Sequence, residues 1–472
     1  MYNASSSKAE EFIDQEEILA TMAYVKEHAH DEGLLRSILK KAGERRGIDH
    51  REAALLLETE NEEIIEEIFA LAKEIKEDIY GRRIVLFAPL YLSNYCVNSC
   101  VYCPYHSKNT HISRKKLSQE EIKKEVIALQ DMGHKRLALE TGEDPKNSPI
   151  EYVLESIDTI YHIKHKNGAI RRVNVNIAAT TVENYTRLKD AGIGTYILFQ
   201  ETYHRETYEK LHPAGPKHNY AYHTEAMDRA MEGGIDDVGI GVLFGLYQYR
   251  YDFVGLLMHA EHLEARFGVG PHTISIPRIR PADDIDVKEF PDAIVDSLFK
   301  KIVAIIRIAA PYTGIIISTR ESQKSREEVL EIGVSQISGA SSTSVGGYVA
   351  KERPEDNSSQ FEVNDGRTLD EIMHWLLDRG FVPSFCTACY RAGRTGDRFM
   401  RLAKSGAIKN VCQPNSLMTL KEYLLDYASP DTLALGEQVI QHEMERIKND
   451  RVKNLAQQYI NQLESGQRDF RF

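Results

Sequence analysis

Short β-branched runs alternate with longer amphipathic segments between residues 83 and 338, and this alternation constrains the fold more than any other feature of the sequence. Such a period is typical of consecutive strand–helix units around a parallel sheet. Eight units in roughly 260 residues match the span of a (β/α)8 barrel, about 250 residues. We therefore predict an α/β fold with a TIM-type barrel, and an open doubly wound sheet remains an alternative because strand number does not prove closure. The expected strands are residues 84–92, 136–140, 172–177, 195–200, 238–243, 273–277, 314–318 and 334–338.

The segments between and around these strands have helical patterns. Ser118 and Glu121 form an S-x-x-E capping box ahead of an apolar stripe, which predicts that a helix begins there. The expected helices within the barrel are residues 118–132, 150–165, 182–190, 218–231, 253–267, 292–308 and 325–332. The predicted organisation is an N-terminal helical segment (1–82), the barrel (83–338), a linker or lid rich in Ser, Gly, Asn and Asp (339–366), and a helical C-terminal extension (367–472).

Composition and charge disfavour several classes of protein. The 472 residues include 59 Lys and Arg against 71 Asp and Glu, a net charge of −12, and no Lys/Arg block resembles a nucleic-acid footprint. The longest apolar runs, such as 84–92, fall well short of the roughly 18 residues that a membrane-spanning helix needs, and the N-terminus is polar and acidic. We therefore expect a soluble cytoplasmic protein that binds neither nucleic acid nor membrane.

Three of the six cysteines stand on one short loop directly after the first expected strand. Cys96, Cys100 and Cys103 form a C-x3-C-x2-C pattern. Three thiolates on one loop can bind three irons of a [4Fe–4S] cluster and leave the fourth iron open to a small chelating ligand. Zinc would need a fourth protein ligand, for which His106 or His111 is a candidate. A loop at the catalytic face of a barrel favours the cluster over zinc.

The cysteine spacing, with Tyr102 before the last cysteine, resembles that of the radical S-adenosylmethionine (SAM) enzymes. The resemblance implies a barrel of the radical SAM class, in which SAM chelates the open iron and an electron from the cluster cleaves it to a 5′-deoxyadenosyl radical. It also implies that Gly142 and Glu143 bind the methionine end of SAM, and that Glu201 and Gly241 address its ribose and adenine. Each has an alternative role, since strand-end carboxylates are often solvated and strand glycines often mark close packing.

The other three cysteines, Cys386, Cys389 and Cys412, lie in the C-terminal extension. By themselves they fit a zinc ribbon that lacks one ligand, or a redox C-x-x-C pair with a spare thiol. In a chain that resembles radical SAM enzymes, we favour a second three-cysteine [4Fe–4S] cluster, again with one open iron.

Four runs carry a closer resemblance: residues 96–106, 172–179, 271–278 and 386–400. They are similar to the tyrosine lyases of [FeFe]-hydrogenase maturation, and the similarity covers nearly the whole chain. It implies cleavage of the Cα–Cβ bond of L-tyrosine to p-cresol and dehydroglycine. Dehydroglycine would be converted to CO and cyanide at the second cluster, yielding an Fe(CO)2(CN) synthon for the hydrogenase H-cluster. The implied partners are a low-potential electron donor, a scaffold GTPase and a second radical SAM maturase.

Further site positions follow from the closer resemblance. Arg320, two residues after Ser318, is a planar bidentate donor suited to a substrate carboxylate, and we assign both residues to the catalytic site. The alternative for Arg320 is a surface ion pair with Glu321. His272 precedes the sixth strand, so it should lie at the opposite, N-terminal mouth of the barrel. The resemblance implies that His272 is the only protein ligand of a labile ferrous iron beside the second cluster, a role that suits an imidazole.

Two other functions remain open at this stage. The related tyrosine lyase of thiamine biosynthesis also makes dehydroglycine but lacks the C-terminal three-cysteine extension, so Cys386, Cys389 and Cys412 discriminate against it. A non-catalytic iron–sulfur carrier or scaffold would give no SAM turnover, and an assay for 5′-deoxyadenosine would separate it from the lyases.

Overall fold

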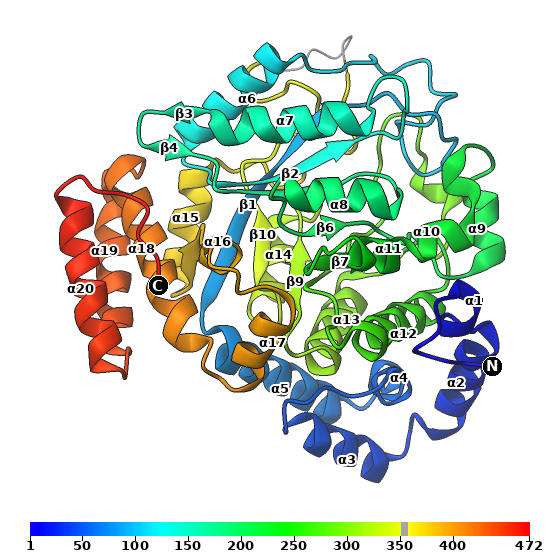
Figure 1. The fold of residues 1–472 in the computed structure, drawn as a ribbon. Helices are drawn as coiled ribbons and strands as arrows, with labels where there is room; N and C mark the ends of the chain where they lie inside the picture. The colour runs from blue at the N-terminus through cyan, green and yellow to red at the C-terminus, as the bar shows by residue number, and fades with distance from the viewer. Residues whose placement is uncertain (351–356) are drawn as a thin grey trace.

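A closed barrel of eight parallel strands forms the centre of the computed structural model, which describes residues 1–350 and 357–472 (Figure 1). Each strand pairs with the next, and the last pairs with the first, where Val85 lies opposite Gln336. This closure confirms the predicted (β/α)8 barrel and excludes the open sheet. The predicted strand 195–200 is reduced to two regular residues. The barrel strands are β1 (Arg83–Ser93), β2 (Arg136–Thr141), β5 (Arg172–Asn176), β6 (Tyr196–Ile197), β7 (Val238–Gly241), β8 (Thr273–Ser275), β9 (Gly314–Ile317) and β10 (Gln336–Ser338).

Amphipathic helices cover the outside of the barrel, and some end where the sequence did not predict. The capping box is present: the Ser118 hydroxyl accepts from the backbone N–H of Glu121, whose side chain accepts from that of Ser118. The helix predicted over 150–165 ends at His162, where a short hairpin follows, and the helix predicted over 218–231 is divided at Glu225. The elements are α6 (Gln119–Met132), α7 (Ile150–His162), β3 (Lys164–His165), β4 (Gly168–Ala169), α8 (Val182–Asp190), α9 (Arg205–Leu211), η1 (Pro216–His218), α10 (Tyr220–Thr224), α11 (Ala226–Glu232), α12 (Tyr249–Phe267), η2 (Val287–Glu289), α13 (Asp296–Ala309) and α14 (Gln323–Leu330).

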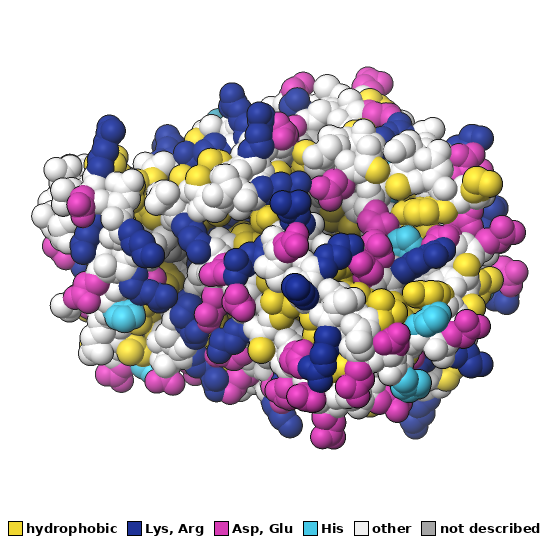
Figure 2. All heavy atoms as spheres, turned by 90° about the horizontal axis from the view of Figure 1, so that it is seen from below, with side chains coloured by type: hydrophobic (Ala, Val, Ile, Leu, Met, Phe, Trp, Pro, Cys, Tyr) yellow, Lys and Arg dark blue, Asp and Glu magenta, His cyan; other side chains and the backbone are white. Residues whose placement is uncertain are grey.

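The N-terminal helices lie against the lower side of the barrel as drawn in Figure 1. Ile64, Ile68 and Ile75 form a buried stripe on α5, which packs against α13, while α2 and α4 pack against α12. Acidic and basic side chains are interspersed across the face seen from below (Figure 2). These helices are α1 (Ala9–Phe12), α2 (Gln15–His28), α3 (Glu32–Ala42), α4 (His50–Glu58) and α5 (Glu62–Tyr80).

His50 joins the N-terminal helices to the barrel. Its Nδ1 lies 2.8 Å from a carboxylate oxygen of Glu261 on α12, and its Nε2 lies 3.0 Å from one of Glu17 on α2. Burial alone would lower the pKa of His50, but the hydrogen bonds and charges of Glu261 and Glu17 outweigh it and raise the pKa. In its protonated form the imidazole donates to both carboxylates.

We expect His50→Gln to destabilise the protein by about 1 to 2 kcal/mol at pH 6, and by less at pH 9, because Gln cannot supply the charge-assisted bonds. A histidine whose folded pKa is raised contributes stability that is fully present below its unfolded pKa and is lost as the pH rises through the folded pKa. Urea unfolding of both proteins at pH 6 and pH 9 measures the difference. His442→Gln, an exposed position on the C-terminal extension, is the control. An equal difference at both pH values would show that His50 is neutral in the folded protein.

The C-terminal extension, predicted as helical, also contributes a strand to the sheet. β11 pairs in parallel with the first residues of β1, where Arg83 lies opposite Val382. The eleven-residue β1 therefore exceeds the other barrel strands in length and reaches past the barrel to the extension. The elements of the extension are α15 (Leu369–Asp378), β11 (Val382–Ser384), α16 (Ala388–Arg391), α17 (Gly396–Lys404), α18 (Lys409–Asp426), α19 (Pro430–Glu445) and α20 (Asp450–Glu464).

The predicted linker or lid, 339–366, has no helix or strand in its described parts, and its positions 351–356 lie outside the described residues. The tyrosine hydroxyl of Tyr91 on β1 donates to the side-chain oxygen of Gln360 at 2.8 Å, so this segment contacts the barrel mouth. Over the described residues, each helix is too short or too polar to cross a membrane.

Candidate functional site

The C-x3-C-x2-C loop faces a cavity at the carboxyl ends of the barrel strands. The cavity has a volume of about 160 Å3, and Cys96, Cys100 and Cys103 all belong to its lining. The loop is held from the far side by a backbone hydrogen bond of 3.0 Å, which the N–H of Val101 donates to the carbonyl of Leu211. The three thiols therefore reach one space at the catalytic end of the barrel.

These thiols suit a cluster better than a zinc ion. All three are free, and burial raises their pKa values, that of Cys103 to about 11, so iron binding would displace protons. The proposed fourth zinc ligands are turned elsewhere, since the Nε2 atom of His106 lies 3.1 Å from Asp284 and His111 is exposed. In the part of the chain that the structure describes, no three His, Cys, Asp or Glu side chains converge on a single-ion site. A cubane instead takes one thiolate at each of three irons.

Gly142 and Glu143, directly after β2, contact the cysteine loop. A Cβ atom at position 142 would lie 2.3 Å from the carbonyl oxygen of Tyr95, so this close approach requires glycine. The carbonyl of Glu143 accepts from the N–H of Val97 at 2.8 Å, and its carboxylate accepts from the Asn98 amide at 2.6 Å. Burial raises the pKa of Glu143. Both residues line the same cavity as the thiols.

Glu201 and Tyr102 also line the cavity, together with Lys217, which sequence analysis missed. Lys217 donates to the Glu201 carboxylate at 2.7 Å, and its ammonium lies 5.7 Å from the centre of the Tyr102 ring. The Tyr102 hydroxyl lies 2.7 Å from Nε2 of His212. Lys217 lies on the short helix η1, far from the cysteines in sequence, and no spacing pattern marked it.

Two residues assigned to the site from sequence lie outside this lining. A Cβ atom at Gly241 would lie 2.7 Å from both the Phe199 ring and the Ser275 carbonyl, so glycine here permits close packing of β7. The Ser318 hydroxyl accepts from the backbone N–H of Arg320 at 3.3 Å and holds the turn after β9. Their positions support structural roles rather than contact with a bound molecule.

Arg320 is an unsatisfied cation in the cavity. Its guanidinium lies 4.0 Å from the centre of the Phe361 ring, and its buried Nε atom has no hydrogen-bond partner. The alternative ion pair with Glu321 is wrong, because Glu321 pairs with Arg278 and Arg280. Burial lowers the pKa of Arg320, but a guanidinium stays charged in proteins. A half-buried guanidinium with an unpaired buried nitrogen favours an anionic ligand, and a carboxylate matches its planar fork.

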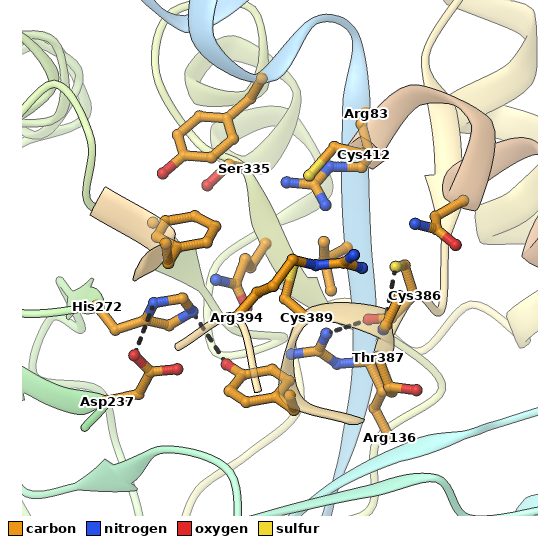
Figure 3. Close-up of a pocket in the computed structure, with 18 residues that line it drawn as sticks. Arg83, Arg136, Asp237, His272, Ser335, Cys386, Thr387, Cys389, Arg394 and Cys412 are labelled. Carbon is orange, nitrogen blue, oxygen red and sulfur yellow. Dashed lines mark hydrogen bonds and ion pairs between the residues drawn. The ribbon is translucent and has the colours of Figure 1, made fainter. Parts of the chain in front are cut away.

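The second group of cysteines shares a cavity with His272, shown in close-up in Figure 3, at the amino ends of the barrel strands. Cys386 precedes α16, Cys389 lies on it, Cys412 lies on α18, and His272 stands directly before β8. All four residues line one cavity. The fold thus brings the histidine from the barrel and the thiols from the extension to the place that the sequence analysis predicted for them.

The His272 ring is oriented from both sides. Its Nε2 lies 3.0 Å from the Tyr390 hydroxyl, and its Nδ1 lies 3.5 Å from a carboxylate oxygen of Asp237. Burial lowers the pKa of His272, so the ring is held in the neutral form that binds metals. A carboxylate beside the second ring nitrogen is a common arrangement around metal-binding histidines.

Three arginines that the sequence analysis missed line this second cavity: Arg83, Arg136 and Arg394. Arg136 donates to the backbone carbonyl of Cys386 at 2.6 Å. A hydrogen bond with Cys412 lowers the pKa of Cys389 to about 6, and the Arg394 charge acts in the same direction. Burial raises the pKa of Cys386, and the hydrogen bond with Cys389 raises that of Cys412, so among the three thiols it is Cys389 that the cavity favours as the thiolate, the form that binds iron.

Comparison with known proteins agrees with this geometry. Residues 90–259 match the Radical SAM superfamily, and residues 275–382 match the Biotin and Thiamin Synthesis associated domain. The chain is 31% identical to the 2-iminoacetate synthase of Salmonella typhimurium over 323 residues, which cover 68% of this chain and 82% of the relative.

Solved structures give a longer match. A crystal structure of HydG, described as a maturase of the [FeFe]-hydrogenase, is 55% identical with a TM-score of 0.94, over 98% of this chain and 100% of that one. HydG from Carboxydothermus hydrogenoformans is 39% identical with a TM-score of 0.81, over 96% of this chain and 99% of that one.

Proposed function

Because this chain belongs to the radical SAM superfamily and, within it, to the HydG family, we propose that it cleaves the Cα–Cβ bond of L-tyrosine to p-cresol and dehydroglycine. We further propose that dehydroglycine is converted to CO and cyanide at the second cysteine site, for an Fe(CO)2(CN) synthon of the [FeFe]-hydrogenase H-cluster. The same proposal includes a cytoplasmic location and three partners: a low-potential electron donor, a scaffold GTPase and a second radical SAM maturase.

The observation that carries the proposal is Arg320, a half-buried guanidinium whose buried Nε atom has no hydrogen-bond partner and which shares a cavity with three thiols. A bidentate pair with an amino-acid carboxylate would satisfy it. The Phe361 ring against its face restricts its orientation, so the substrate carboxylate would be held in one position relative to the cysteine loop.

The other residues of this cavity have distinct roles. Cys96, Cys100 and Cys103 would hold the [4Fe–4S] cluster typical of the superfamily, and Glu143 would accept from the amine of SAM. With the cluster and SAM bound, the site supplies a 5′-deoxyadenosyl radical. Glu201 is kept in place by Lys217 and would receive the ribose hydroxyls.

At the second site, Cys386, Cys389 and Cys412 would hold another [4Fe–4S] cluster. The neutral, oriented His272 would hold a labile ferrous iron beside it. The supporting observations are the shared cavity and its arginines, of which Arg83 opposes the rise in pKa of Cys386 and Cys412 and Arg394 lowers the pKa of Cys389.

A second candidate function is synthesis of 2-iminoacetate alone, because relatives with that name match 68% of this chain. The three C-terminal cysteines and His272 favour the reaction that continues to CO and cyanide. Cleavage of tyrosine in the cavity of Cys96, Cys100 and Cys103 would not require them. A non-catalytic cluster carrier is disfavoured by the unsatisfied Arg320, which a carrier does not need.

Anaerobic reconstitution followed by incubation with SAM, reductant and tyrosine tests the proposal. We expect 5′-deoxyadenosine, p-cresol, CO and cyanide. Formation of p-cresol without CO or cyanide would support the 2-iminoacetate synthase. Absence of 5′-deoxyadenosine from fully loaded protein would leave only the carrier.

Arg320→Lys should weaken tyrosine binding about tenfold or more and leave SAM binding within about twofold, because a point charge replaces a planar fork and two parallel bonds become one. The measurement is the KM for tyrosine beside the dissociation constant for SAM. Arg280→Lys, which keeps a charge next to Glu321 at the same mouth, is the matched control. A loss of SAM affinity with normal tyrosine binding would assign Arg320 to the cofactor instead.

A further inference from the structure

Glu201 stands at a strained corner of the cavity. It follows β6, and its φ of 70° lies in the left-handed region that residues other than glycine rarely adopt. Such a conformation costs on the order of 1–3 kcal/mol and persists only where surrounding contacts fix it. Strand contacts hold one side of the corner, since the N–H of Leu243 donates to the Glu201 carbonyl at 3.1 Å. The backbone conformation of Glu201 must also be fixed by contacts of the next two residues, Thr202 and Tyr203.

Asp252, on the first turn of α12, makes these contacts. One of its carboxylate oxygens accepts from the Thr202 hydroxyl and from the backbone N–H of Tyr203, both at 2.8 Å. Asp252 and Thr202 are fully buried. The other carboxylate oxygen, Oδ2, has no hydrogen-bond partner. Burial raises the pKa of Asp252 to about 7, and the bonded oxygen remains an acceptor in either protonation state.

Tyr203 is fixed at every polar atom. Besides the bond from its N–H to Asp252, its carbonyl accepts from the Tyr220 hydroxyl at 2.9 Å, and its own hydroxyl lies 2.9 Å from Nδ1 of His259. A Cβ atom at Gly255 would lie 2.6 Å from the Tyr203 side chain, so α12 approaches the corner as closely as glycine allows. Positions 252, 255 and 259 share one face of α12, and this face therefore packs against the residues that follow Glu201.

We propose that Asp252 is a positioning residue for the cofactor: through Thr202 and Tyr203 it holds Glu201, and with it Lys217, in the geometry that binds SAM. Asp252 itself does not line the cavity, and it acts only through the corner. This inference rests on the proposed role of Glu201 toward SAM. It does not depend on tyrosine cleavage or on the second cysteine site.

Three variants of reconstituted enzyme test the role, with the SAM dissociation constant as readout in the absence of tyrosine. Asp252→Leu removes both acceptor bonds with a larger, similarly branched apolar side chain and should raise this constant about tenfold, equivalent to about 1.4 kcal/mol. Asp252→Asn keeps the bonded oxygen and should stay within about twofold of wild type. Thr202→Val removes one donor and should give about a threefold rise, and it serves if Asp252→Leu does not fold. Iron and sulfide content should remain normal in all three.

A second readout is independent of the loaded enzyme. Hydrogen exchange of the Tyr203 amide in the protein as isolated should be faster in Asp252→Leu than in Asp252→Asn. Val254→Ala, a buried position on α12 that faces the α2–α4 groove, is the packing control and should change neither readout. Unchanged SAM affinity in both Asp252→Leu and Thr202→Val would overturn the proposal. Equal weakening by Val254→Ala would also overturn it, since general loss of packing would then explain the effect. Wild-type protein that binds SAM but makes no p-cresol would contradict the lyase function alone.

Discussion

Replacing Cys100 with alanine should reduce 5′-deoxyadenosine formation to background, and Cys96→Ala and Cys103→Ala should do the same. The three thiols come from one loop and reach one cavity, with no other cysteine in its lining. Two thiolates cannot define a cluster with one open iron for SAM. The measurement is the yield of 5′-deoxyadenosine from SAM under anaerobic conditions with a strong reductant, beside the iron content of each variant.

Ser99→Ala is the matched control in the same loop, because it removes a hydroxyl that lies 3.0 Å from that of Ser107 and leaves the thiols in place. It should retain SAM cleavage at a small cost in stability. Product above background from any of the three cysteine variants, with iron still bound, would contradict the assignment of the cluster ligands.

The barrel could be predicted because its signals are local. Each of the strand–helix units carries its own hydrophobic period, and the capping box at Ser118 is contained in four residues. The strand β11 could not be predicted, because Val382–Ser384 is too short to show a period and includes Pro383. It forms by pairing with the first residues of β1. Two segments that pair across about three hundred residues of sequence carry no local pattern that would predict the pairing.

The candidate site divides in the same way. The cysteines are marked by spacing, and the position of His272 followed from its place before a strand. Lys217, Arg136 and Asp252 reach their sites through tertiary contacts, and their neighbours in the sequence do not reveal them. Gly241 lies outside the cavity lining, and its role stays a prediction, because a strand glycine that permits close packing carries the same sequence signal as one that faces a ligand.

Removing the second cysteine site should separate the two halves of the proposed reaction. In the variant with Cys386→Ala and Cys389→Ala, we expect p-cresol to remain detectable and CO release and the iron synthon to be lost. The two cavities lie at opposite mouths of the barrel, and none of the described residues found to line one also lines the other. In the proposed reaction, radical formation and Cα–Cβ cleavage would use only Cys96, Cys100, Cys103 and the residues around them.

His272→Ala should have a milder effect, because Cys386, Cys389 and Cys412 would still hold a cluster while the labile iron loses its protein ligand. Anaerobic analysis of p-cresol and CO from both variants, with iron content and EPR spectra to check cluster occupancy, makes the comparison. The retained p-cresol is the internal control for folding of the barrel. If the double cysteine variant releases CO at the normal rate, CO forms away from the extension, and its three cysteines revert to a zinc or purely structural role.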